Sequence, residues 1–128
     1  MTDRVALDTS VLMMPVELDV RLFEELDRLL GEYEPTIPQA VLEELRRLSE
    51  KGGTEGTAAN VGHDLAVERC LVVDTETADA DDALVELARE GGIDYVATND
   101  LPLRDRVLEA GRPVIALRGR NKLAITQP

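Results

Sequence analysis

Residues 95–117, YVATNDLPLRDRVLEAGRPVIAL, contain a strand pattern, a helix pattern and a second strand pattern in direct succession. Tyr95–Ala97 is a short apolar run, Leu103–Ala110 has helical spacing, and Gly111 is a typical helix stop. Pro113–Leu117 is a continuous apolar strand of the kind found in buried parallel sheets. This succession predicts an α/β fold whose parallel strands are joined by helices.

The same alternation extends toward the N-terminus. We expect strands at Val5–Leu7 and Leu71–Val73, and helices at Val20–Leu30, Pro38–Glu50, Thr57–Arg69 and Asp79 or Ala80 to Glu90. The glycine-containing segment 51–54 is expected to be a flexible connection between two helices. A chain of 128 residues is long enough for one domain, here residues 1–128, so we expect a three-layer α/β/α sandwich around a central, mainly parallel sheet.

Acidic residues outnumber basic residues by 26 to 14, which gives a net charge of −12. A chain with this charge repels nucleic acid at long range, unless its surface is adapted to molar salt that screens the repulsion. Halophilic adaptation is therefore one hypothesis for the acidity. No apolar run approaches the roughly 18 residues of a membrane span, and residues 1–4 lack a signal-peptide pattern. We therefore expect a soluble, cytoplasmic protein with no membrane contact.

Acidic side chains lie just after two of the expected strands. Val5–Leu7 runs into Asp8, and Tyr95–Ala97 is followed, after two polar residues, by Asp100. In open α/β sheets, ligands bind beyond the carboxyl ends of the strands. Asp8 and Asp100 are therefore candidate site residues.

Two of the expected helices contribute further carboxylates. Glu44 borders the apolar face of its helix, whereas Glu43 points away from it. Asp81 lies beside the buried side of its helix, whereas Asp82 faces outward. Asp79 and Asp81 are also residues of the kind that caps a helix N-terminus, and this is the role we prefer for Asp79.

Four carboxylates would therefore meet at one end of the sheet, and they would repel one another unless a cation neutralised them. The four are Asp8, Glu44, Asp81 and Asp100. Oxygen ligands suit Mg²⁺ or Mn²⁺, and an ion held this way favours phosphodiester hydrolysis. The single histidine, His63, and the single cysteine, Cys70, offer no zinc site. The alternative stays open that these aspartates are only turn residues or helix caps.

Four short motifs, in this order, resemble those of the PIN-domain nucleases along nearly the whole chain. They are DTS at 8–10, IPQAVLEEL at 37–45, ADDAL at 80–84 and VATND at 96–100. The resemblance implies a five-stranded parallel sheet between helices and an enzyme that cuts RNA at a Mg²⁺- or Mn²⁺-binding cluster of carboxylates. It also implies a catalytic and metal-binding role for Asp8, Glu44, Asp81 and Asp100.

Other residues receive supporting roles from the same resemblance. Asp82 is a further candidate ligand, since the register of its motif is uncertain by one position. Thr9, Ser10 and Thr98 are implied to be hydroxyls that hydrogen-bond the ligands.

RNA binding would require cationic contacts, and basic residues concentrate late in the chain. We expect phosphate binding by Arg118, Arg120 and Lys122 around a turn. Arg104 and Arg106 are expected only to balance nearby acids. With two tyrosines and one phenylalanine, base stacking on aromatic rings contributes little.

The segment 103–118 resembles the PIN branch that processes ribosomal RNA precursors, so the expected partners are RNA and a ribosome-processing protein. VapC-type toxins cut tRNA or rRNA and are held by an antitoxin. They usually have an aromatic residue shortly after the last aspartate, where this chain has Leu101-Pro102-Leu103. The toxin remains an alternative, as does a non-catalytic module that binds RNA or protein. Residues 13–16 and the helix from Val20 offer apolar surface that would serve either a homodimer or the core.

Two other folds with clustered aspartates fit less well. A phosphoryl-accepting receiver domain needs a pair of acids near the first strand and a lysine after the last, but Asp3 is misplaced and Leu117 leads to arginine. A haloacid-dehalogenase phosphatase needs a second aspartate two residues after Asp8, and Ser10 stands there instead.

Overall fold

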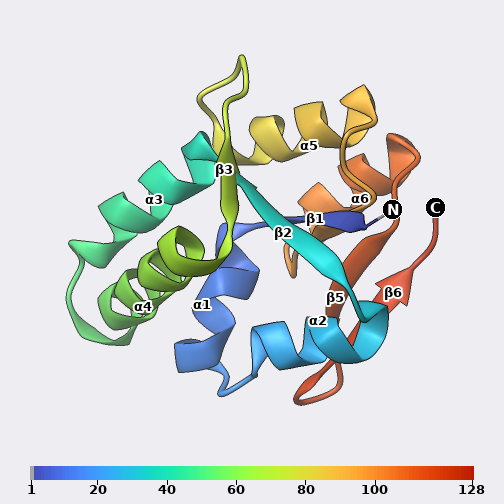
Figure 1. Cartoon of the computed structure of the whole chain (residues 1–128). Coiled ribbons are helices and arrows are strands. Elements are labelled where there is room, and N and C mark those ends of the chain that lie inside the picture. The colour runs from blue at the N-terminus through green and yellow to red at the C-terminus, as the bar shows by residue number, and fades with distance from the viewer. Residues whose placement is uncertain (1) are drawn as a thin grey trace.

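The computed structural model describes residues 2–128 and contains one six-stranded sheet with helices on both faces (Figure 1). The strands are β1 (Asp3–Leu7), β2 (Tyr33–Pro38), β3 (Leu71–Val73), β4 (Tyr95–Ala97), β5 (Val114–Arg118) and β6 (Lys122–Thr126). The helices are α1 (Thr9–Glu17), α2 (Leu22–Leu30), α3 (Gln39–Ser49), α4 (Gly53–Arg69), α5 (Ala80–Glu90) and α6 (Leu101–Glu109). The predicted α/β/α fold class is confirmed.

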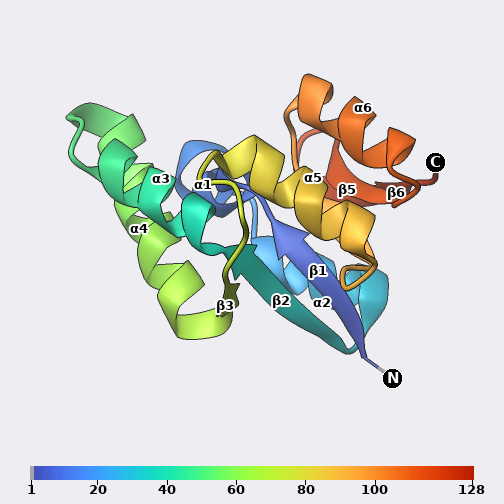
Figure 2. The ribbon, with the colours of Figure 1, turned by 90° about the horizontal axis from the view of Figure 1, so that it is seen from above.

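The strand order is β3-β2-β1-β4-β5-β6, and the first five of these strands are parallel. Strand β6 was not expected from the sequence, and it runs antiparallel to β5 at the edge of the sheet. Helices α5 and α6 cover one face, α1 and α2 lie on the other, and α3 and α4 pack together beyond the carboxyl ends of β1 and β2 (Figure 2).

The central strands form the middle of the core. Val5, Ala6 and Leu7 of β1 have no exposed surface, and neither do Val96 and Ala97 of β4. Strands covered on both faces by helices are expected to be apolar without alternation, as these are. The buried pair β1–β4 therefore gives a rigid base for whatever lies at its carboxyl end.

Helix α1 is the main element that the sequence pattern did not predict. Its sequence, TSVLMMPVE, contains Pro15 and is too uniformly apolar to show an amphipathic stripe. Met13 and Met14 are 5% and 1% exposed. The structure supports the core-packing role considered for this segment, and Leu22, Phe23 and Leu26 of α2 are buried in the same core.

Helix boundaries also differ from the prediction by one or more residues in α2, α3, α4 and α6, and Pro38, expected to begin a helix, is the last residue of β2. Helix α4 begins at Gly53, so part of the expected flexible connection is helical, and it packs closely on α1. A Cβ atom on Gly62 of α4 would lie 2.7 Å from the backbone oxygen of Leu12, which leaves room only for glycine. Helix α6 begins two residues earlier than expected, directly after Asp100.

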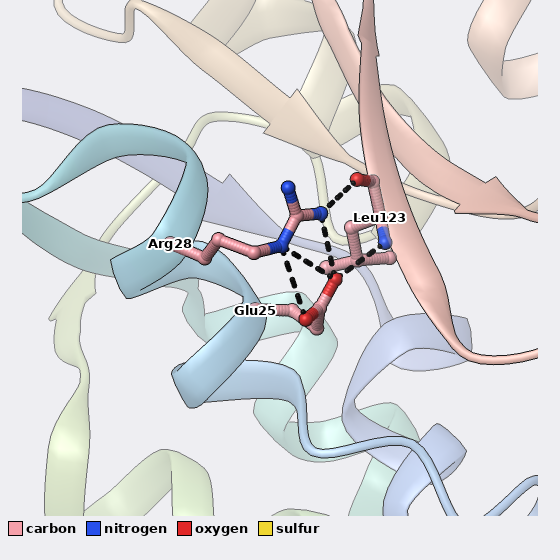
Figure 3. A network of polar contacts seen from close by, with 3 residues as sticks. All are labelled: Glu25, Arg28 and Leu123. Carbon is pink, nitrogen blue, oxygen red and sulfur yellow. Dashed lines mark hydrogen bonds and ion pairs between the residues drawn. The ribbon is translucent and has the colours of Figure 1, made fainter.

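The outer edge of β6 is held by side chains from α2 (Figure 3). The Leu123 backbone N–H donates to Glu25 Oε1 at 2.9 Å, and the Leu123 carbonyl accepts from Arg28 Nη2 at 2.8 Å. Arg28 and Glu25 also form an ion pair at 2.8 Å, and only 14% of the Glu25 side chain is exposed. These contacts satisfy backbone groups that an edge strand would otherwise leave open for another chain.

None of the helices between residues 2 and 128 combines the length and the apolar character that a membrane span requires.

The Arg28 side chain, followed by the Leu123 N–H, lowers the pKa of Glu25 to about 2. The folded-state pKa lies below the unfolded value of about 4.3, so this carboxylate stabilises the fold above the unfolded pKa, and the effect is lost as pH falls through the folded pKa. We therefore expect Glu25→Gln to lower the melting temperature by several degrees at pH 7, and by progressively less between about pH 4.3 and 2. Glu24→Gln is the matched control, because Glu24 pairs with the 80%-exposed side chain of Arg21. Equal effects of the two substitutions would contradict the role given to Glu25.

Candidate active site

The direction of chain travel across the sheet reverses between β1 and β4. From β1 the chain moves outward through β2 to β3, and from β4 it moves the opposite way to β5. Such a switch point leaves a crevice at the carboxyl ends of the two strands, where ligands bind in open α/β sheets. Leu7 and Ala97 are register partners there, so Asp8 and Thr98 follow them side by side.

Asp8 is 4% exposed and accepts three hydrogen bonds. Its Oδ2 atom accepts from Thr98 Oγ1 at 2.6 Å and from Ser10 Oγ at 2.9 Å, and its Oδ1 atom accepts from the Thr9 backbone N–H at 2.7 Å. Burial raises the pKa of Asp8, these hydrogen bonds oppose the rise, and nearby Glu44 adds to it. The hydrogen bonds fix the orientation of both carboxylate oxygens.

Thr98 connects Asp8 to Asp100. Its hydroxyl donates to Asp8 and accepts from the Asp100 backbone N–H at 3.0 Å. Asp100 Oδ1 in turn accepts from the Leu103 N–H at 3.0 Å and caps α6. The helix-cap role considered for Asp100 is thus observed, and it fixes the orientation of this exposed carboxylate at the start of α6.

Glu44, on α3, lies near Asp8. Thr9 Oγ1 donates to Glu44 Oε1 at 2.5 Å, so the first residue of α1 orients this carboxylate. The neighbouring Glu43 is exposed and lies near Gln39 on the outer side of the helix. The different orientations predicted for the two glutamates are therefore observed.

Asp81 and Asp82 also differ in their surroundings. Asp81 is half-buried, and its pKa is raised to about 6 by burial first, then by the charges of the other carboxylates: Asp8, Asp100, Asp79 and Glu44. Asp82 is exposed and pairs with Arg106 at 2.8 Å. Asp79 caps α5 by accepting from the Asp82 N–H, as expected. Asp81 is thus the member of the pair whose pKa is affected by the charges of the other candidate carboxylates.

The converging acids do not form a closed coordination shell. Within residues 2–128, no three His, Cys, Asp or Glu side chains are arranged so that they could hold a metal ion as they stand. The donors that converge are all carboxylate oxygens, which suit hard ions that retain several waters and do not need a full protein cage. Cys70 is not part of this set, and burial raises the pKa of its thiol to about 12.

Asn99 is a residue of this region that the sequence analysis did not single out. Its backbone N–H donates to Ser10 Oγ at 3.1 Å, and its Oδ1 atom accepts from the Leu117 N–H at 2.9 Å. Asn99 therefore joins the ends of β4 and β5 to the start of α1. The signal in the sequence that could have identified Asn99 was its position between Thr98 and Asp100 in the motif at the end of the strand.

The three basic residues proposed to bind phosphate lie in the β5–β6 hairpin. Arg118, Arg120 and Lys122 are exposed around Gly119, whose φ of +74° favours glycine. Arg106 pairs with Asp82, as expected for a residue that balances an acid. Arg104 pairs with Asp105. It also borders a cavity beside Thr98 and Asn99, so its surroundings include more than the acid that it was expected to balance.

Residues 5–120 match the model of the PIN like domain family. The match covers the carboxylates and most of the described fold. The chain belongs to this family. It is also similar over its length to Ribonuclease VapC4 of Methanocaldococcus jannaschii, with 29% identity over 127 residues and 95% of each chain covered.

Two solved structures share the architecture. The structure of the PIN domain endonuclease Utp24 has a TM-score of 0.78 and 26% identity, and the comparison covers 98% of this chain and 92% of that one. A domain of a functionally unknown protein from Methanocaldococcus jannaschii has a TM-score of 0.66 and 19% identity, covering 94% and 95% of the two chains. The predicted family resemblance is confirmed.

The raised pKa of Asp81 predicts a stability effect of opposite sign to that of Glu25. The folded-state pKa exceeds the unfolded value, so the ionised carboxylate costs stability as pH rises from about 4 to about 6, and the full cost applies above that. We expect Asp81→Asn to raise the melting temperature at pH 7.5 without divalent ions by roughly 2–5 °C, with no gain near pH 4. Asp82→Asn, which breaks an exposed ion pair, should give no gain. A lower melting temperature for Asp81→Asn would contradict this account.

Proposed function

We propose that this protein is a divalent-metal-dependent endoribonuclease that hydrolyses RNA phosphodiester bonds. The observation that carries the proposal is the gathering of carboxylates at the β1–β4 switch point, where hydrogen bonds from Thr98 and Thr9 orient Asp8 and Glu44. Burial first, and then the charges of the neighbouring carboxylates, raise the pKa of Asp81 there. Membership of the PIN like domain family supports it, and so do relatives named ribonuclease and endonuclease.

Asp8, Glu44, Asp81 and Asp100 are the residues that would hold the ion. When bound, Mg²⁺ or Mn²⁺ would supply an activated water and stabilise charge on the scissile phosphate. Ser10 and Thr98 fix the Asp8 carboxylate, and Thr9 fixes Glu44. These three hydroxyls thus set carboxylates in position before substrate arrives, which is the effect of supporting hydrogen bonds around metal ligands. Asp82 is engaged with Arg106 and is the weaker candidate.

The β5–β6 hairpin is the proposed phosphate-binding element. Because β5 is parallel to β4, its carboxyl end and the hairpin lie at the same end of the sheet as the carboxylates. Arg118, Arg120 and Lys122 would there offset the repulsion between RNA and a chain of net charge −12.

Processing of ribosomal RNA or another RNA precursor is the biological role we favour, on the resemblance of the segment 103–118. A VapC-type toxin with an antitoxin partner is the second candidate, favoured by the full-length similarity to Ribonuclease VapC4. Induced expression in a host cell separates the two roles, because a toxin arrests growth. A neighbouring reading frame for a short antitoxin would favour the same role.

Cleavage of a structured RNA with Mn²⁺ or Mg²⁺ tests the proposed chemistry. We expect Asp8→Asn to reduce the rate by at least about 100-fold, because the loss of a ligand should exceed the effect of losing a supporting contact. Glu44→Gln should also reduce the rate, whereas Glu43→Gln, its exposed neighbour, should not. Mn²⁺ should raise the melting temperature of the native chain more than that of Asp8→Asn. If neither chelation nor Asp8→Asn changes cleavage, the metal mechanism is wrong.

The hypothesis of halophilic adaptation predicts a dependence on salt. At an ionic strength of roughly 1 M, the screening length falls to about 3 Å, so repulsion among the 26 acidic side chains should be largely removed. We expect both the melting temperature and the rate of RNA cleavage to rise between dilute buffer and roughly 1 M KCl. Full stability and turnover in dilute buffer would contradict the hypothesis.

A further inference from the structure

A cavity of about 420 Å³ adjoins the candidate active site, between the start of α6 and the β5–β6 hairpin. Thr98 and Asn99 form one wall, and they also hydrogen-bond the groups around Asp8. The cavity therefore lies next to the carboxylates where cleavage is proposed, and Thr98 and Asn99 belong to both. Its volume falls in the usual range of ligand pockets, roughly 300–1,000 Å³.

Two large exposed apolar side chains line the cavity. The large apolar side chains that are exposed in residues 2–128 are Leu18, Val67, Leu71, Val72 and Leu101. Leu18 and Leu101, which are 50% and 60% exposed, both line this cavity, together with Ala116 and Ala124. Exposed apolar side chains around a concave site are typical of ligand binding.

The charge of the cavity is opposite to that of the whole chain. Arg104 and Arg118 line it, whereas none of the acidic side chains in the described range 2–128 does so. In a chain with 26 acids and 14 bases, this is a local reversal of charge beside a cluster of carboxylates. An anionic ligand is the kind that such a lining attracts.

Asn99 adds a directional hydrogen-bond donor. Its Oδ1 atom is already used by the Leu117 N–H, so the side-chain amide is held in one orientation. Its Nδ2 atom makes no hydrogen bond to other residues within 2–128, and it remains able to donate to a carbonyl or ring nitrogen of a ligand.

We infer that this cavity binds one nucleotide of single-stranded RNA next to the scissile phosphate. The base lies on the apolar lining around Leu101, Ala116 and Ala124, and the flanking phosphates contact Arg104 and Arg118. Aliphatic contact with the base takes the place of stacking on aromatic rings, which this chain nearly lacks. The inference rests on the proposed function, since it concerns the substrate of the same site.

The test measures binding of fluorescein-labelled single-stranded RNA oligonucleotides by anisotropy, with a chelator present to prevent cleavage. One abasic position is moved along the oligonucleotide, and each form is titrated with the native chain and with Ala124→Leu, which fills the cavity. We expect one abasic position to weaken native binding about tenfold. In Ala124→Leu, intact RNA should bind about tenfold more weakly and the same abasic position should have no further effect. An equal abasic penalty in both proteins overturns the inference.

Arg118→Gln provides a second variant that does not depend on filling the cavity or on the folding of Ala124→Leu. We expect it to reduce the slope of log K against log salt by about 0.7, the value for one cation on a single strand. Arg89→Gln on α5, an exposed cation that does not line the cavity, should leave the slope unchanged. Equal slopes for native and Arg118→Gln, or binding of polyglutamate as tight as that of RNA, overturn the inference.

These outcomes are distinct from failure of the proposed function. Loss of the abasic effect in Ala124→Leu, with cleavage unaffected by Asp8→Asn, would support the nucleotide site and reject the metal-dependent nuclease. Metal-dependent cleavage, with intact RNA bound equally by the native chain and Ala124→Leu, would support the nuclease and overturn the nucleotide site.

Discussion

The burial of one carboxylate at the junction of β1 and β4 is the constraint on which the rest of the site depends. Removing an ionised carboxylate from water is costly unless hydrogen bonds compensate. At Asp8 the compensation comes from Thr9, Ser10 and Thr98, at 2.6–2.9 Å. Thr98 belongs to the segment after β4, and the other two residues begin α1, so the burial of one side chain fixes how two distant parts of the chain meet.

The same constraint organises the surrounding acids. The hydroxyl of Thr98 also accepts from the Asp100 N–H, and the hydroxyl of Thr9 donates to Glu44. Capping of α5 and α6 by Asp79 and Asp100 sets the helix starts at this end of the sheet. These hydrogen bonds and helix caps hold the carboxylates near one another. Burial first, and then the charges of these neighbours, raise the pKa of Asp81.

Charge is distributed unevenly around this end of the sheet. The carboxylates occupy the crevice, while the cavity beside it is lined by Arg104 and Arg118 and by no acid of residues 2–128. The antiparallel strand β6 makes this arrangement possible, because it returns the chain from the hairpin and contributes Ala124 to the cavity. Its outer edge is closed by Glu25 and Arg28, so the strand forms part of the folded unit (Figure 3).

The sequence alone determined the parallel α/β class, most helix and strand positions, and the sides on which Glu44 and Asp81 lie. These features follow from local periodicity and from the position of acids at strand ends, which depend on neighbouring residues only. Helix α1 was missed because Thr9–Glu17 is too uniformly apolar to show a helical period, and β6 because a short edge strand is stabilised by its contacts with β5 and α2. Only the tertiary structure showed the contacts of Asn99, the cavity with its apolar and cationic lining, and the effect of neighbouring carboxylates on the pKa of Asp81. These features arise where residues far apart in the chain come close together.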